Sequence, residues 1–163
     1  MTLIVPFDGR ELAQAALVRA TQFNEVLDEK LSVVSVIPKN NTAYARERGW
    51  ITNEESFDGE TIVTRLQEQV VEISPEAHFE YIVVGQYAQA GQIASKIRKF
   101  ARKHDGSIVF IGSENAGRVV QRVSSVGGTV AADRAYETMI IPSAKPTEIE
   151  ELERALPTHE VLD

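Results

Sequence analysis

Segment 6–9 of this chain carries a carboxylate and a glycine directly after an apolar run. Its Asp8 side chain can accept hydrogen bonds from an amino group or a hydroxyl of a bound ligand. The same carboxylate is placed to cap a following helix, because Glu11 stands three residues later, in the spacing of a capping box. Both roles stay open at this point, since an aspartate that caps a helix can also contact a ligand.

A second segment, 112–117, has the composition of a phosphate-binding loop. It begins with Gly112 and Ser113 and continues through Asn115 to Gly117. Glycine lets a phosphate approach the backbone closely, and the free N–H groups at the start of a helix bind such an anion. The alternative is that the two glycines only form turns.

The residue types that many enzymes need are absent or poorly placed. The chain has no cysteine, which excludes disulfides, thiolate zinc sites, iron–sulfur clusters and cysteine nucleophiles. His78 and His104 precede apolar runs instead of following them, and His159 lies near the end of the chain. No paired-histidine or serine-nucleophile motif is present. We therefore predict neither metal catalysis nor triad hydrolysis, and a binding role is favoured over an enzymatic one.

The composition limits the partners of this protein. Its 163 residues, 43% hydrophobic and 25% charged, with a net charge of −7, suit one globular domain. The acidic balance argues against nucleic acid, because binding to phosphates needs clustered Lys and Arg. No apolar stretch approaches the roughly 20 residues that span a bilayer, and the first apolar run is too short for a signal peptide. We expect a cytoplasmic protein without a nucleic-acid or membrane partner.

Apolar runs alternate with helical patterns along the chain. The runs at 3–7, 31–37, 79–84, 107–111 and 138–141 predict strands, and the periodic segments between them, about 8–24, 58–73, 91–104 and 119–130, predict helices. This order predicts an α/β fold, an open doubly wound parallel sheet of five strands in the order 3-2-1-4-5 with helices on both faces. Ligands bind such sheets beyond the carboxyl ends of the strands where the order reverses. Segments 6–9 and 112–117 meet there, with Val36 as a third wall.

Two segments lie outside this alternation. The connection 39–57 is long for a compact domain, and we expect one helical turn near 43–48 and a surface for a protein partner. Its Trp50 either packs onto the domain, which is the commoner arrangement, or binds a partner or ligand. Residues 143–163 have two basic and six acidic side chains, which places −4 of the net −7 in this tail. We therefore divide the chain into a domain, 1–142, and an acidic tail, 143–163, with one short helix.

The strands and loops together resemble the universal stress protein family over about residues 2–142. The segments that carry the resemblance are 4–9, 83–101, 108–113, 123–126 and the closing strand 139–141. The resemblance implies the five-stranded open fold and a homodimer that pairs through the last strand. Its interface residues would be Thr138, Met139, Ile140 and Ile141. Some members of the family bind ATP through the motif G-x-x-G-x9-G-[ST].

This sequence departs from that motif. Asn115 stands where a second glycine should follow Gly112, Ser124 replaces the late glycine, and only the hydroxyl of Ser125 remains. A side chain at position 124 would crowd a triphosphate that needs close backbone contact. Our first hypothesis is therefore a homodimeric stress-response protein with weak or absent nucleotide binding.

The second hypothesis is a working adenine-nucleotide binder that holds ATP or AMP with Mg²⁺ and hydrolyses ATP slowly at most. A protein without any cofactor is an equal expectation. The nucleotide-binding residues would be Pro6, Phe7, Asp8, Val36, Gly112, Ser113, Asn115, Gly117, Ser124, Ser125 and Val126.

Overall fold

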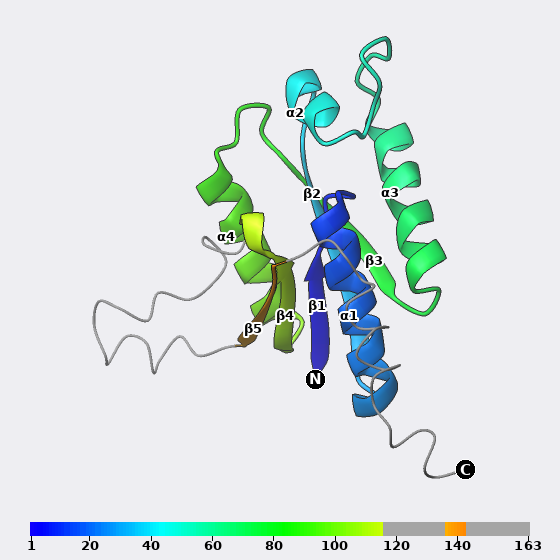
Figure 1. Ribbon diagram of the computed structural model, residues 1–163. Coiled ribbons are helices and arrows are strands. Elements are labelled where there is room, and N and C mark those ends of the chain that lie inside the picture. Colours follow the sequence, from blue (N-terminus) through cyan, green and yellow to red (C-terminus); the bar gives the residue numbers. More distant parts are fainter. Residues whose placement is uncertain (116–135, 143–163) are drawn as a thin grey trace.

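The computed structural model describes residues 1–115 and 136–142 (Figure 1). Strands and helices alternate along most of this part of the chain. Their bounds are β1 Thr2–Pro6, α1 Glu11–Leu27, β2 Lys30–Pro38, α2 Thr42–Glu47, α3 Gly59–Ile73, β3 His78–Val84, α4 Ala90–Lys103, β4 Gly106–Gly112 and β5 Glu137–Ile141. The expected helix at 119–130 and the tail 143–163 lie outside the described residues.

The five strands form one parallel sheet in the order β3-β2-β1-β4-β5, which confirms the predicted topology. β1 lies at its centre, and all five of its residues are buried. Because side chains alternate along a strand, Leu3 and Val5 join the core beneath α1 and α3, whereas Ile4 joins the core beneath α4. Helices therefore cover both faces of the sheet (Figure 1).

Short polar side chains determine where the helices begin. Asp58 caps α3, with its carboxylate accepting from the Glu60 N–H at 3.2 Å. Gln89 and Gln92 form a reciprocal capping box at the start of α4. The predicted capping box at α1 is wrong, because its N-cap residue is Arg10 and no side chain caps it. The Asp8 carboxylate instead accepts the Arg10 backbone N–H at 3.0 Å, which forms a turn before the helix.

Two successive residues join the end of α4 to β4. Asp105 adopts the left-handed conformation, with φ of 54°. Gly106 is the first residue of β4, where a Cβ would lie 2.9 Å from the Ala101 carbonyl oxygen. Glycine is thus needed at this position for close packing of the helix end on the strand.

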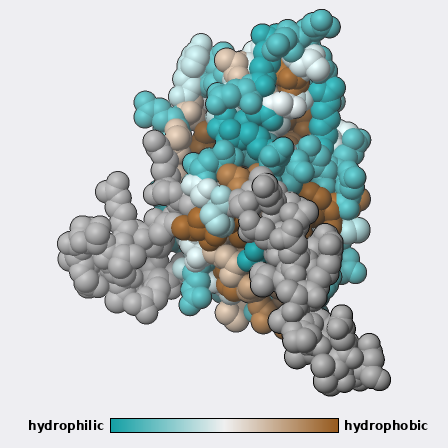
Figure 2. Space-filling view, in the orientation of Figure 1, coloured by the Kyte–Doolittle hydropathy of each residue, from teal (hydrophilic) through white to brown (hydrophobic). Residues whose placement is uncertain are grey.

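The long connection 39–57 lies against the domain. It contains α2, as the expected turn near 43–48 indicated, and Trp50 is buried with 4% of its surface exposed. A bidentate pair between Arg65 of α3 and Glu55, with nitrogen–oxygen distances of 3.0 and 2.7 Å, ties the end of the connection to α3. Hydrophilic residues cover the region of α2 and α3 on the surface that Figure 2 shows. Among the described residues, no helix has the length and apolar character to cross a membrane.

Candidate functional site

A cavity of about 550 Å³ lies at the carboxyl ends of β1, β2 and β4. This is the point where the strand order reverses, as the sequence predicted. Its volume falls in the range of small-molecule sites. The apolar part of the lining comes from the strands and from α4, and includes Val34, Val36, Ile93, Ala94, Ile97 and Ile111. The polar part comprises Asp8, Tyr44, Arg48, Glu114 and Asn115.

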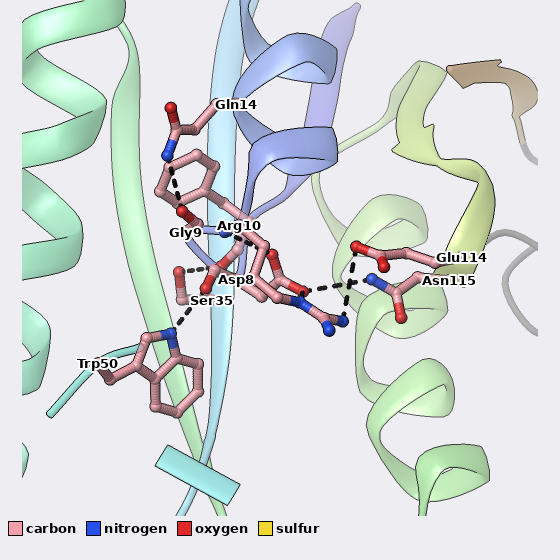
Figure 3. Close-up of polar contacts among 9 residues, drawn as sticks. Asp8, Gly9, Arg10, Gln14, Ser35, Trp50, Glu114 and Asn115 are labelled. Carbon is pink, nitrogen blue, oxygen red and sulfur yellow. Dashed lines mark hydrogen bonds and ion pairs between the residues drawn. The ribbon is translucent and has the colours of Figure 1, made fainter. Parts of the chain in front are cut away.

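The Asp8 carboxylate lies at the centre of a polar cluster that crosses the cavity mouth (Figure 3). One oxygen accepts the Arg10 backbone N–H, and the other accepts Arg10 Nε at 3.1 Å and Asn115 Nδ2 at 3.3 Å. The Arg10 guanidinium also lies 3.5 Å from the Glu114 carboxylate. Burial opposes the charge of Arg10, but the attraction of Asp8 and Glu114 outweighs it and raises the Arg10 pKa. The segments after β1 and β4 are therefore linked by one ion pair, Arg10–Glu114, and by the hydrogen bond from Asn115 to Asp8.

Three side chains hold the backbone that presents Asp8. Ser35 Oγ donates to the Phe7 carbonyl at 2.6 Å, Trp50 Nε1 to the Asp8 carbonyl at 2.7 Å, and Gln14 Nε2 to the Gly9 carbonyl at 2.8 Å (Figure 3). Gly9 has φ of 81°, a conformation that side chains other than glycine rarely adopt. Since three successive carbonyls are bonded, this loop holds Asp8 in a single orientation.

A wall of the cavity comes from α2. Asn41 caps this helix, with its side chain accepting the Tyr44 N–H at 3.0 Å. The Tyr44 ring lies 5.5 Å from the Trp50 ring, centroid to centroid, and carries the Arg48 guanidinium on its face. Burial raises the pKa of Tyr44, while the charge of Arg48 opposes the rise. The tyrosine therefore stays a neutral hydroxyl that can donate or accept a hydrogen bond.

Gly112 lines the cavity, but it does not form the turn that the sequence suggested as one of its two roles. Its φ is not positive, so it forms no left-handed turn. A Cβ added there would lie 2.7 Å from the Leu12 Cβ and 3.5 Å from the Leu12 backbone carbonyl carbon. This glycine allows α1 to pack closely on the end of β4.

The structure brings most of the described candidates together. Of the predicted nucleotide-binding residues, Pro6, Phe7, Asp8, Val36, Gly112 and Asn115 line the cavity. Ser113 is exposed in the helical turn 113–115 directly after β4, and it is not part of the cavity lining. Gly117, Ser124, Ser125 and Val126 lie outside the described residues.

Several lining residues were not predicted from the sequence. Tyr44 and Arg48 lie in the long connection, where no motif or spacing marks them. Glu114 was within the predicted loop but was not selected, although a charged residue directly after a strand was a usable signal. The apolar residues of α4 were interpreted only as core.

Comparison with known proteins places this chain in a family. The model of the universal stress protein family matches residues 1–142. The chain belongs to the universal stress protein family. No curated protein matches the sequence.

Two solved structures share the fold of this family member. A universal stress protein in complex with cAMP has 16% identity and a TM-score of 0.50, over 87% of this chain and 97% of its own. The universal stress protein from Archaeoglobus fulgidus in complex with dAMP has 15% identity and a TM-score of 0.51, over 87% of this chain and 98% of its own. At this identity the likeness shows the fold alone.

The described residues of this family member do not fit a triphosphate. Gly112 faces Leu12 of α1, so its missing side chain makes room for a helix and not for an anion. The residue two positions further, Glu114, adds a carboxylate at the cavity lining, where it would repel phosphate oxygens. Asn115 takes the place of the motif's second glycine and donates to Asp8.

Proposed function

We propose that this universal stress protein acts as a cytoplasmic homodimer and binds an adenine nucleotide weakly, as a monophosphate and not as a triphosphate. The observation that carries the proposal is the ion-pair cluster of Asp8, Arg10 and Glu114 across the mouth of the cavity. The cavity itself is open to a nucleoside, while the negative charge of Glu114 at its mouth repels a highly charged ligand such as a triphosphate.

The cavity supports binding of a nucleoside. Its volume of about 550 Å³ and its apolar side chains on α4, Ile93 and Ile97, suit a planar base, and Tyr44 can bond to a polar edge of that base. The ligands of the two structural relatives, cAMP and dAMP, each carry one phosphate. A monophosphate fits the proposal because it avoids the repulsion of Glu114 better than a triphosphate does.

The polar cluster supports weak affinity. A ribose hydroxyl that bonds to Asp8 must first displace Asn115 Nδ2 or Arg10 Nε, because both carboxylate oxygens already have donors. The exchange replaces one hydrogen bond by another, so its net gain is below the roughly 1 kcal/mol of a new bond. A nucleotide would therefore gain little at the position that the sequence favoured as its main contact.

Calorimetry with purified full-length protein tests this function. AMP should bind with a Kd of about 0.1–1 mM, and ATP should bind no tighter, with or without Mg²⁺. A preference of tenfold or more for Mg²⁺–ATP over AMP would contradict the proposal. No heat from AMP or adenosine at millimolar concentration would also contradict it.

A charge-neutral variant of the loop sharpens the test. Glu114→Gln removes a negative charge from the cavity lining, so the phosphate of AMP is repelled less and AMP should bind about three- to tenfold tighter. The matched control is Glu25→Gln, since Glu25 is exposed near the far end of α1 and lines no part of the cavity. Equal affinities in the two variants would show that the cluster does not limit binding.

The homodimer is proposed through β5. Within the described sheet this strand pairs with β4 alone, and Ile140 is exposed on it, whereas the Ile141 side chain is buried in the core. An unpaired, apolar edge strand is a ready site for pairing with a second copy. We further propose segment 39–57 as the surface for other protein partners.

A further inference from the structure

Arg48 is a partly buried cation without an anionic partner among the described residues. It follows α2 directly and lines the cavity. Its Nε is shielded from solvent and makes no hydrogen bond. The neighbouring arginines form ion pairs with Glu55, Asp8 and Glu114, and none of these three carboxylates pairs with Arg48.

The shielded Nε–H of Arg48 has lost its contact with water without gaining an acceptor among the described residues. Removing a guanidinium from water is unfavourable unless an opposite charge or hydrogen-bond acceptors replace the lost hydration. Arg10, at the same cavity mouth, has two carboxylates for this purpose, but within residues 1–115 and 136–142 Arg48 has only the face of an aromatic ring. Since the Arg48 Nε–H has no acceptor among the described residues, an anion in the cavity would be most stabilised beside Arg48.

The stacking on Tyr44 prepares Arg48 for such an anion. The guanidinium carbon lies 3.4 Å from the centroid of the tyrosine ring, which holds the plane of the group. Stacking uses the face of a guanidinium and leaves the N–H groups at its edge available. A planar edge with several donors matches two oxygens of a phosphate.

We propose that Arg48 binds the phosphate of the nucleoside monophosphate in this cavity. The proposal rests on the proposed function and adds to it the residue that recognises the anion. It moves the phosphate from the loop at 112–115, where Glu114 opposes it, to the wall formed by α2. The base then lies along Ile93 and Ile97 of α4, on the apolar side of the same cavity.

Calorimetry with AMP and with adenosine separates recognition of the phosphate from recognition of the base. In Arg48→Gln the affinity for AMP should fall about tenfold or more, while the affinity for adenosine stays as in the wild type. The AMP affinity of Arg48→Lys should lie between those of the wild type and Arg48→Gln, because lysine keeps the charge but lacks the planar group of donors. The matched control is Arg46→Gln on the same helix, since Arg46 is exposed and does not line the cavity.

Three outcomes would overturn the inference. AMP affinity in Arg48→Gln could equal that of the wild type, or AMP and adenosine affinities could fall by the same factor, which would indicate a packing role alone. Arg46→Gln could also weaken the binding of AMP as much as Arg48→Gln does, which would indicate a general effect of charge. Unfolding temperatures of all variants establish that each one is folded.

A second measurement distinguishes failure of this inference from failure of the proposed function. The Arg48 Nε–H signal in a nitrogen-15 NMR spectrum is assigned by its loss in Arg48→Lys and followed during titration with inorganic phosphate. A shift of this signal, absent for Arg46, supports the anion site even if no nucleotide binds. A signal that stays in place with phosphate and with bound AMP refutes the role of Arg48, whatever the protein does with adenosine.

Discussion

Replacing Gly112 with alanine tests how α1 packs on the sheet beside the cavity. The added Cβ would lie 2.7 Å from the Leu12 Cβ, whereas two carbon atoms in contact are about 3.5–4.0 Å apart. Neither atom can rotate away, because a Cβ position is set by the backbone. The helix would have to move by about 1 Å, and overpacking of this kind costs about 1–3 kcal/mol of the free energy of unfolding.

Urea and thermal unfolding measure this cost. For a domain of this size, the unfolding temperature of Gly112→Ala should fall by about 3–10 °C. Gly91→Ala is the matched control, because position 91 lies in α4 with nothing within 4 Å of the new Cβ. That variant should gain up to about 1 kcal/mol, since alanine is the better helix former.

A double variant tests the assigned contact directly. In Leu12→Gly the opposing Cβ is absent, so Gly112→Ala should cost less in that background than in the wild type. Equal costs in both backgrounds would refute the packing argument. A Gly112→Ala protein of unchanged stability that loses AMP affinity would instead assign this glycine to ligand approach.

Three further predictions concern other contacts. Arg65 and the Thr52 backbone lower the pKa of Glu55 from 4.5 to about 2, so its contribution to stability is present above pH 4.5 and lost as the pH falls toward 2. The difference in unfolding temperature between wild type and Glu55→Gln should therefore shrink over that pH interval, and a constant difference would contradict this assignment. Ile140→Lys should convert a dimer to a monomer by light scattering, and an unchanged mass would place the interface away from β5. Trp50→Phe leaves the Asp8 carbonyl without its donor, so chemical denaturation should show a loss of about 1–2 kcal/mol, and wild-type stability would exclude that role.

The order of the strands was predictable because it depends on local patterns. Continuous apolar runs such as 31–37 are typical of strands buried on both faces, and β2 is buried along nearly its whole length. Periodic residues such as Ile62, Leu66 and Val70 mark the buried side of a helix, and all three are buried in α3. The connection rules for parallel sheets then leave few arrangements.

Individual side-chain roles were less predictable, because they depend on contacts between distant residues. For Asp8 the sequence left a helix cap and a ligand contact open; the carboxylate does not cap α1 but bonds to Arg10 and Asn115. The bond from Trp50 to the Asp8 carbonyl joins residues 42 positions apart, and no spacing rule connects them. Similarly, Gly112 suggested a phosphate-binding loop or a turn, and no local pattern indicated that a side chain at this position would clash with Leu12.

The sequence alone determined the architecture of this protein and the end of the sheet where a ligand would bind. Both follow from hydrophobic periodicity and from the geometry of parallel strands, which operate over short stretches of chain. Only the tertiary structure decided which charged side chains meet at the cavity there. Asp8 and Glu114 both pair with Arg10, whereas Arg48 lies beside the cavity on a tyrosine ring, and no carboxylate of the described residues pairs with it. Such a distribution of charge depends on which side chains meet in space, and distances of a few ångströms determine their interaction.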